Sequence, residues 1–166
     1  MPTGAPVPFA SIAAPEDGDA TGPEAPFAAD AFEVARDALG SRVERVQQNL
    51  HGLDPDALGT FDFVHAGDVL LHLARPLDGL RGIRRVTAEG GMALLADVFD
   101  PGLADPTLTR YFGGFVDHHW WTPSLDCLAQ MVYDAGFSEV ELVTVYNLAP
   151  WDMPEGHWRA VLRARP

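Results

Sequence analysis

The hydrophobic positions of this chain form short apolar runs that alternate with amphipathic segments. Phe61–Ala66 and Met92–Phe99 are rich in apolar residues, which is typical of strands buried in a parallel sheet. Between them, Leu77–Thr87 carries apolar residues at the spacing of one helix face, namely Leu80, Ile83 and Val86. This alternation of strand and helix predicts an α/β fold.

Turn residues mark where these two strands end or begin. Ala66-Gly67-Asp68 closes the first strand, and we expect a helix from Asp68 to Leu73. Gly90-Gly91 is expected to form a turn that leads into the second strand. Two parallel strands so spaced form one side of a ligand crevice at the carboxyl edge of a sheet.

The C-terminal part of the chain predicts a helix followed by a β-hairpin. Ser124 is a good N-cap for a helix over Leu125–Ala135, which a glycine follows. Val140–Tyr146 and Trp158–Ala164 have strand patterns, and the loop 147–157 is too short for a crossover helix. We therefore expect an antiparallel edge on a doubly wound sheet.

The N-terminal part has a different composition. Residues 1–28 contain six prolines and no basic residue, so we expect this segment to be disordered or irregular. Residues 29–166 are expected to form a partial domain. It begins with a helix over Ala31–Leu39, capped by Asp30, and a short strand over Val43–Gln47.

Two further segments are rich in turn residues. Asp54-Pro55, in a loop over residues 52–59, predicts a turn or short helix. Residues 100–123 contain three prolines and three glycines, and we expect a long irregular segment there. Long loops in compact domains are often lids or binding segments.

Charge and cysteine content narrow the classes of partner and compartment. The chain has 24 acidic and 11 basic residues, a net charge of −13, and no lysine. This balance disfavours nucleic-acid binding, which needs basic side chains facing phosphates.

Cys127 is the only cysteine, so no internal disulfide forms, and a cytoplasmic protein is expected. No apolar run approaches the roughly 18 residues of a membrane span, and we find no secretory signal.

The order of motifs resembles that of class I S-adenosylmethionine-dependent methyltransferases. Phe32–Arg36 resembles the helix after the family's second strand, and Val43–Leu50 resembles the third strand and its exit. Phe61–Val64 is similar to the family's fourth strand, with its FDxV pattern. The later matches are, in chain order, Val69–Leu73 with Pro76, Gly90-Gly91, Trp120, Trp121, Pro123, Ala135–Phe137 and Trp158–Arg165.

The family's first βαβ unit has no clear counterpart. Its strand, glycine-rich loop, helix and second strand need roughly 45 residues, whereas 31 residues precede Phe32. Glu16–Gly22 superficially resembles the loop, but the nine residues between Gly22 and Phe32 are too few for the helix and strand. The resemblance therefore implies a Rossmann-like methyltransferase sheet truncated at its N-terminal βαβ unit, with an antiparallel C-terminal hairpin.

The resemblance also implies a set of residues that bind the cofactor, S-adenosylmethionine. Asn49 and Leu50 match the position that meets the adenine edge, although the family more often has Asp where Asn49 stands. Ala66, Gly67 and Asp68 match the segment whose backbone approaches the methionine end, and small residues permit that approach. The structural alternatives are a solvated loop for Asn49 and a helix N-cap for Asp68.

Two polar residues near the strand ends are candidates for contact with a methyl acceptor. His72 lies between leucines, and the resemblance implies that it faces the crevice, where it orients or deprotonates the acceptor. Asp97 lies near the end of the second apolar strand, within reach of an amine or hydroxyl of the substrate. The alternatives are a structural histidine and a surface or strand-edge aspartate.

The irregular segment 100–123 holds the remaining candidates. We expect Arg110, Tyr111, Trp120 and Trp121 to bind substrate, and His118 and His119 to be catalytic. The alternative for the tryptophans is packing of a lid onto the body. Adjacent histidines on a strand point to opposite faces and no third ligand has a useful spacing, so we expect no metal site.

The sequence thus leads to two functional hypotheses. The first is methyl transfer from S-adenosylmethionine to a small organic acceptor, with no nucleic acid and no membrane as partner. The second is a non-catalytic relative that acts as a binding or oligomerisation partner, because half of the cofactor cradle is not recognisable. In either case the sheet would be exposed, and we expect a second copy or a partner chain to cover it.

Overall fold

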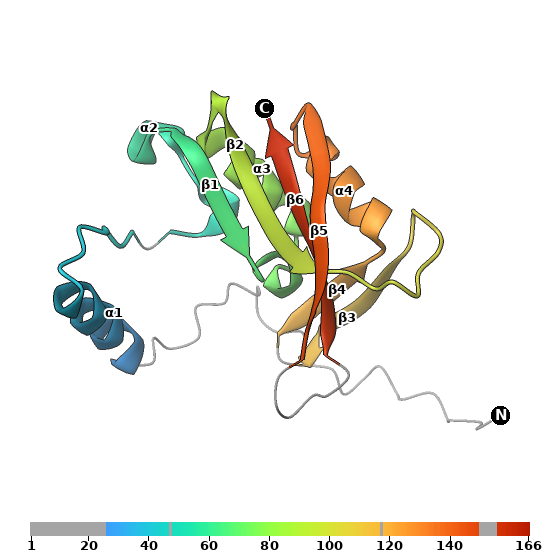
Figure 1. Cartoon of the computed structure of the whole chain (residues 1–166), viewed down its shortest axis with the longest axis horizontal. Coiled ribbons are helices and arrows are strands. Elements are labelled where there is room, and N and C mark those ends of the chain that lie inside the picture. The colour runs from blue at the N-terminus through green and yellow to red at the C-terminus, as the bar shows by residue number, and fades with distance from the viewer. Residues whose placement is uncertain (1–25, 47, 117, 150–155) are drawn as a thin grey trace, which may run out of the picture. The chain divides into compact units, whose positions relative to one another are not determined.

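The computed structural model describes residues 26–46, 48–116, 118–149 and 156–166, shown in Figure 1. The chain divides into one compact unit over residues 1–46 and a second over residues 47–166, which are described separately here. No helix among these described residues is long and apolar enough to cross a bilayer.

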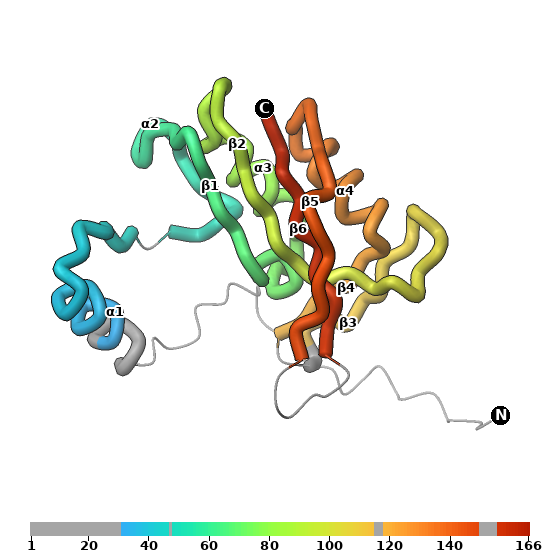
Figure 2. Tube along the Cα trace, in the orientation of Figure 1, coloured from blue at the N-terminus to red at the C-terminus, as the bar shows by residue number. Residues whose placement is uncertain are grey.

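A four-stranded mixed sheet forms the centre of the second unit. Its strand order is β1-β2-β6-β5, with β1 over Phe61–Gly67, β2 over Thr87–Val98, β5 over Glu139–Leu148 and β6 over His157–Arg165. β1 pairs with β2 in parallel, whereas β6 pairs antiparallel with both β2 and β5. The trace in Figure 2 shows β6 returning beside β5, which confirms the predicted α/β class and C-terminal hairpin.

Two helices supply the core on one face of this sheet. α3 spans Pro76–Val86 and α4 spans Leu125–Asp134, and both lie behind the sheet in Figure 1. The Ser124 hydroxyl accepts the Cys127 N–H, as expected of an N-cap. The most deeply buried hydrophobic side chains, including Leu80, Ile83, Val132 and Leu162, come from both helices and from β6. Both helices are therefore confirmed.

The opposite face of the sheet carries exposed hydrophobic side chains. Val64 on β1 packs against the core cluster, so the alternation of a strand places Phe61 and Phe63 on the other face. These two side chains are 45% and 52% exposed. Strands of doubly wound sheets are normally covered on both faces. Within residues 48–166, the described helices α3 and α4 cover only one.

The Gly90-Gly91 pair lies inside β2, so the expected turn before this strand is wrong. Phe61 pairs with Thr87 and Phe63 pairs with Met92, which leaves extra residues of β2 looped out between these pairs. A Cβ on Gly91 would lie 2.8 Å from the Asp62 carbonyl oxygen. Glycine is therefore needed at this position, because β1 and β2 approach each other closely where their pairing is irregular.

The segment expected to be irregular contains a second, two-stranded sheet. β3 spans Thr109–Val116 and β4 spans His119–Pro123, and the two strands are antiparallel. The prediction failed because the glycines at 113 and 114, which suggested a loop, lie inside β3 where the pairing register shifts. Alternation then directs neighbouring side chains of this hairpin to opposite faces.

The expected helix from Asp68 to Leu73 is only a 3-10 turn, η3, over Leu70–His72. Asp68 has a positive φ of 49° and lies outside this turn, so its expected role as an N-cap is wrong. The turn is short because Pro76 follows closely and disfavours helical conformation in the residue before it. Arg75 accordingly has an extended φ of −126°.

Two short elements precede β1 and pack on α3. η2 spans Leu50–Gly52, and α2 spans Pro55–Leu58 with Asp54 as its N-cap, which confirms the short helix expected there. A Cβ on Gly82 of α3 would lie 2.1 Å from the Leu50 carbonyl oxygen. The absence of a side chain at Gly82 thus lets η2 approach the helix backbone.

The first unit contains one helix among its described residues. α1 spans Pro26–Ala38, so Asp30 lies within the helix and is not its N-cap. Residues 26–28 of the segment expected to be disordered or irregular begin α1, and residues 1–25 lie outside the described part of the chain. The expected strand over Val43–Gln47 is also wrong for the described residues 43–46, because no described strand pairs with them.

Candidate active site

The chain leaves β1 through an unusual turn that an ion pair holds in place. Asp68 has a positive φ, and its N–H donates to the Ala96 carbonyl at 2.8 Å. Arg159 of β6 donates from Nε to Asp68 Oδ1 at 2.9 Å. The same guanidinium donates from Nη1 to the His157 carbonyl at 3.0 Å. One buried arginine therefore connects the β1 exit to the start of β6.

The Asp97 side chain forms hydrogen bonds with the backbone that follows this turn. Its Oδ2 accepts the N–H groups of Val69 and Leu70 at 3.1 and 2.7 Å, and its Oδ1 accepts the Val98 N–H at 2.9 Å. The side chain is buried, so the alternative of a surface aspartate is wrong. Burial raises the pKa of this carboxyl to about 6, although the three N–H groups oppose the shift. Contact between Asp97 and a substrate remains a prediction.

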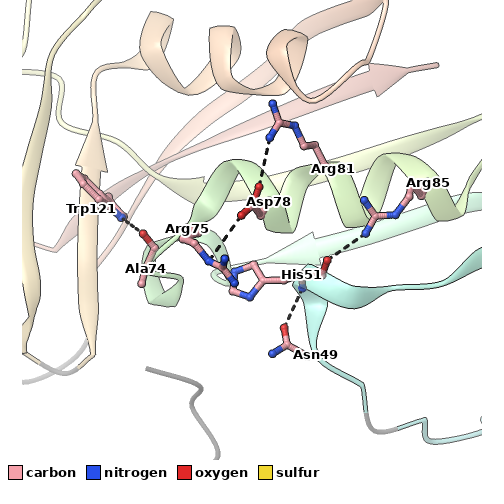
Figure 3. A network of polar contacts seen from close by, with 8 residues as sticks. All are labelled: Asn49, His51, Ala74, Arg75, Asp78, Arg81, Arg85 and Trp121. Carbon is pink, nitrogen blue, oxygen red and sulfur yellow. Dashed lines mark hydrogen bonds and ion pairs between the residues drawn. The ribbon is translucent and has the colours of Figure 1, made fainter. Parts of the chain in front are cut away.

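The β3–β4 hairpin is attached to the segment after β1 by two hydrogen bonds. His72 Nδ1 lies 3.2 Å from the His118 carbonyl oxygen, and because a carbonyl only accepts, this nitrogen carries the proton. Figure 3 shows the second bond, in which Trp121 Nε1 donates to the Ala74 carbonyl at 3.2 Å. This contact agrees with the alternative that Trp121 packs the segment onto the body.

His119 is half-buried in the hairpin with one ring nitrogen already engaged. Its Nε2 lies 2.9 Å from the Trp121 carbonyl oxygen and 2.8 Å from Thr122 Oγ1. The Phe112 ring packs on the imidazole at a centroid separation of 4.8 Å. Burial lowers the pKa of His119, and the positive charges of His157, His72 and Arg159 act in the same direction.

One face of the hairpin forms a wall of a cavity of about 490 Å³, which we name the acceptor cavity. It brings together two predicted site residues, Arg110 and His119. Arg110 forms an ion pair with Asp100, which also lines the cavity. The other lining residues are Phe99, Pro101, Phe112, Thr122, Gly156, His157 and Trp158.

The other face of the hairpin borders a smaller, mostly apolar cavity of about 200 Å³. Trp121 and Asp97 line it, together with Leu70, Leu71, Pro76, Val98, Thr109, Pro123, Leu128 and Met131. The pairs Thr109–Pro123 and Arg110–Thr122 are successive in the hairpin, so their side chains face opposite sides. Among the predicted substrate residues, Arg110 and Trp121 therefore belong to different cavities.

Three further predicted residues lie on the hairpin but line neither of these cavities. The Tyr111 ring packs against Trp121 and Trp120, with centroid separations of 4.6 and 6.2 Å. His118 has a positive φ of 58°, and its side chain is exposed. The expected roles of Tyr111, Trp120 and His118 in binding and catalysis remain predictions.

Asn49 and Leu50 make structural contacts in η2. Asn49 Oδ1 accepts the His51 N–H at 2.9 Å, and Arg85 of α3 donates to the His51 carbonyl at 3.1 Å, as Figure 3 shows. Leu50 packs against the core cluster. A further network on α3 in the same view joins Asp78 to Arg75 and Arg81. Adenine binding by Asn49 and Leu50 remains a prediction.

The described residues fit part of an S-adenosylmethionine site. At the β1 exit, Ala66 and Gly67 leave the backbone accessible, and a Cβ on Gly67 would lie 3.1 Å from His65 Cε1. These small residues are compatible with close approach of a ligand. Glu16–Gly22, the segment similar to a glycine-rich loop, lies outside the described residues. No group of three metal-ligating side chains occurs among the residues that were described.

Arg159 and His157 were not among the site residues predicted from the sequence. A charged residue inside an apolar strand was the available signal for Arg159, which is buried and bonded to Asp68 at the β1 exit. His157 and Phe112 reach the acceptor cavity through strand pairing that local sequence does not reveal.

Comparison with known proteins identifies the family. A family model described as "Methyltransferase domain" matches residues 20–95. The N-terminal domain of EvdMO1, solved in the presence of SAH and D-fucose, superimposes with a TM-score of 0.58 at 19% identity, covering 80% of this chain and 59% of that one. The family-model match assigns residues 20–95 to a class I S-adenosylmethionine-dependent methyltransferase domain.

Other solved structures share the fold at low sequence identity. The YcgJ protein of Bacillus subtilis superimposes with a TM-score of 0.60 at 14% identity, covering 82% of this methyltransferase-family chain and 78% of that one. The 1,6-didemethyltoxoflavin-N1-methyltransferase of Burkholderia thailandensis was solved with S-adenosylhomocysteine. It superimposes with a TM-score of 0.58 at 16% identity, covering 81% of this chain and 56% of that one.

Two curated relatives are tRNA U34 carboxymethyltransferases. The protein of Actinobacillus pleuropneumoniae serotype 3 (strain JL03) is 30% identical over 117 residues, which are 68% of this chain and 35% of the relative. The protein of Mannheimia succiniciproducens is 29% identical over 119 residues, which are 69% of this chain and 36% of that relative. The chain thus spans about a third of the length of these relatives.

Proposed function

We propose that this chain takes part in methyl transfer from S-adenosylmethionine to a small organic acceptor, which binds in the acceptor cavity. The cofactor, when bound, supplies the methyl group from its sulfonium. The residues of the chain align the acceptor, exclude water and hold or remove a proton. On this proposal Ala66, Gly67 and Asp68 meet the methionine end of the cofactor, and Asn49 and Leu50 meet its adenine.

The observation that carries the proposal is the position of the acceptor cavity beside the β1 exit. Arg159 bonds both to Asp68, at that exit, and to the carbonyl of His157, which lines the cavity. In open α/β sheets, ligands bind beyond the carboxyl ends of the strands. A methyltransferase-family chain with a lined cavity in this place has room for an acceptor next to the segment that meets the cofactor.

The charge of the chain supports a small acceptor over RNA. The curated relatives are named for tRNA, but they are about three times longer than the matching segment. This chain carries a net charge of −13. Binding of RNA depends on basic side chains that neutralise phosphates. Arg110, which lines the acceptor cavity, and Arg159, which donates to the His157 carbonyl, are each paired with a carboxylate.

A second candidate function is that of a non-catalytic binding or oligomerisation partner. The observation that favours it is the exposure of Phe61 and Phe63 on the sheet face opposite α3 and α4. Large apolar side chains exposed on a sheet face are typical of interaction sites. In this case a second copy or a partner chain covers the sheet, and cofactor binding is weak or lost.

Calorimetric titration of the full chain with S-adenosylmethionine and S-adenosylhomocysteine separates these functions. Methyl transfer predicts a Kd below about 100 µM, equivalent to about 5.5 kcal/mol. Gly67→Val should weaken this binding at least about tenfold, because added bulk at the β1 exit obstructs the ligand. Gly90→Ala is the matched control, since a Cβ there meets nothing within 4 Å. Absence of binding to the wild-type chain would overturn the first function and favour the second.

A further inference from the structure

The smaller cavity, on the other face of the β3–β4 hairpin from the acceptor cavity, has no part in the proposed function. We name it the apolar cavity, and its walls come from η3, α3, β2, the hairpin and α4. We propose that it is a second binding site, which takes a small uncharged apolar molecule about the size of a single hydrocarbon ring. This ligand is neither the methyl acceptor nor the cofactor.

Hydrogen bonds and ring contacts hold the hairpin wall of the apolar cavity in place without a ligand. Trp121 Nε1 donates to the Ala74 carbonyl at 3.2 Å (Figure 3), and the indole packs against Tyr111 at a centroid separation of 4.6 Å. The Pro123 carbonyl accepts the Asp100 N–H at 2.9 Å. These contacts oppose collapse of the cavity, because its walls cannot move inward without breaking them.

The helix α4 supplies a second apolar wall. Leu128 and Met131 are three residues apart, so they lie on the same face of this helix. Leu128 is buried, and Met131 is partly buried against the core. Ser124, which directly follows the hairpin, caps α4 by accepting the Cys127 N–H at 3.1 Å. The start of the helix is therefore fixed beside the end of β4, and a methionine in this wall can adapt its shape to an apolar ligand.

The polar groups at the apolar cavity favour an uncharged ligand. Asp97 is the only ionisable side chain among the described residues that line it. Its oxygens already accept the N–H groups of Val69, Leu70 and Val98. A charged ligand would lose its hydration here, an anion would also meet the Asp97 carboxyl, and a cation would compete with three N–H groups for it. A hydrocarbon carries none of these costs.

The volume of the apolar cavity sets the size of the ligand. A dry apolar cavity of roughly 150 Å³ in a protein interior holds benzene, so a cavity of about 200 Å³ has room for a ring with a methyl substituent. The ligand supplies the dispersion contacts that the walls of an unfilled cavity lack. Because these contacts join the hairpin to α4, a bound ligand should stabilise the folded chain.

Toluene is the probe that tests this inference, and the methyl group of Met131 reports its position. In the full chain with isotope-labelled methionine methyl groups, toluene should shift the NMR signal of Met131 with a Kd below about 1 mM. The signal of Met92, which does not line the apolar cavity, should stay in place. Toluene should also raise the midpoint of thermal unfolding. Benzoate, which has the same ring with a carboxylate, should bind at least about tenfold more weakly.

Two variants fill the apolar cavity from different walls. Met131→Trp on α4 and Thr109→Trp on β3 should each weaken toluene binding at least about tenfold, because the added indole occupies the space of the ligand. Gln130→Trp is the matched control, since it places the same ring at an exposed position of α4 and should bind toluene like the wild type. Calorimetric titration measures the affinity of each variant.

An unshifted Met131 signal at saturating toluene would overturn the inference, and so would benzoate binding as tight as that of toluene. Wild-type affinity in Thr109→Trp or in a folded Met131→Trp protein would also overturn it. If Met131→Trp does not fold, Thr109→Trp decides, because its side chain starts from an exposed position on the hairpin. None of these measurements uses the cofactor or the methyl acceptor, so their result is independent of the proposed function.

Discussion

At the residue scale, a few buried polar side chains shape the exit from β1. Asp97 receives three backbone N–H groups, and Arg159 holds Asp68 in its positive-φ turn. The sequence suggested Asp68 and Asp97 as ligands of cofactor and substrate. Their observed bonds are to the protein itself. Asp97 accepts backbone N–H groups of the turn, which would otherwise lack partners, and Asp68 accepts from the Arg159 side chain. These bonds position the cavity walls on either side of the turn.

The raised pKa of Asp97 predicts a specific pH dependence of stability. The folded chain binds this proton more tightly than the unfolded chain, since the pKa rises from 3.8 to about 6. The contribution of protonated Asp97 to the free energy of unfolding is therefore fully present below about pH 4, and it is lost as the pH rises through about 6. We expect the free energy of unfolding of the wild type, relative to Asp97→Asn, to fall by about 3 kcal/mol across this window.

Urea denaturation of both proteins at a series of pH values, followed by tryptophan fluorescence, measures this difference. Other titrating groups cancel in the comparison, because the two proteins share them. A difference between the two proteins that stays constant from about pH 4 to about pH 7 would contradict a raised pKa at Asp97.

At the element scale, local sequence patterns predicted the helices correctly, whereas strands that depend on pairing with a distant segment were predicted poorly. α3 and α4 follow from helical spacing with a proline start and a serine cap. The strand expected at Val43–Gln47 is absent from residues 43–46, and the hairpin of β3 and β4 was not foreseen. A strand forms only when a partner completes its hydrogen bonds, and a short window of sequence does not contain that partner.

The packing of η2 on α3 depends on one glycine. In Gly82→Ala, the new Cβ would lie 2.1 Å from the Leu50 carbonyl oxygen, a backbone atom. We expect a net loss of about 1–2 kcal/mol, because overpacking costs roughly 1–3 kcal/mol and helix propensity returns at most ~1 kcal/mol. Thermal unfolding measures the loss, with Gly90→Ala as the variant that should show almost none. A stabilised Gly82→Ala protein would show that η2 does not pack on this helix face.

At the scale of the whole molecule, one face of the sheet lies open in the described part of the second unit. Phe61 and Phe63 are exposed there, although doubly wound sheets normally bury both faces. The sequence pattern of β1 does not agree with this finding. Its apolar residues on both faces predict burial of both faces, whereas among the described residues only Val64 and Ala66, on one face, are partly buried against the core.

We therefore expect the chain to associate through this face. Light scattering at increasing protein concentration should show a growing average mass. The double variant Phe61→Thr, Phe63→Thr should stay monomeric, because threonine keeps strand propensity while it removes apolar area. Tyr133→Gln, which removes an exposed aromatic ring from α4, is the matched control and should associate like the wild type. A wild type that remains monomeric throughout would remove the basis for this interface.

The sequence by itself determined the periodicities of α3, α4, β1 and the C-terminal hairpin, and with them the methyltransferase family. These features follow from residue spacing and from caps that lie within a few positions of one another. Only the tertiary structure decided which polar groups meet. Asp68 and Arg159 are 91 residues apart, and His119 reaches the acceptor cavity through the pairing of β3 with β4. Strand order and register place such residues together, and both are set by burial of the whole sheet rather than by any local segment.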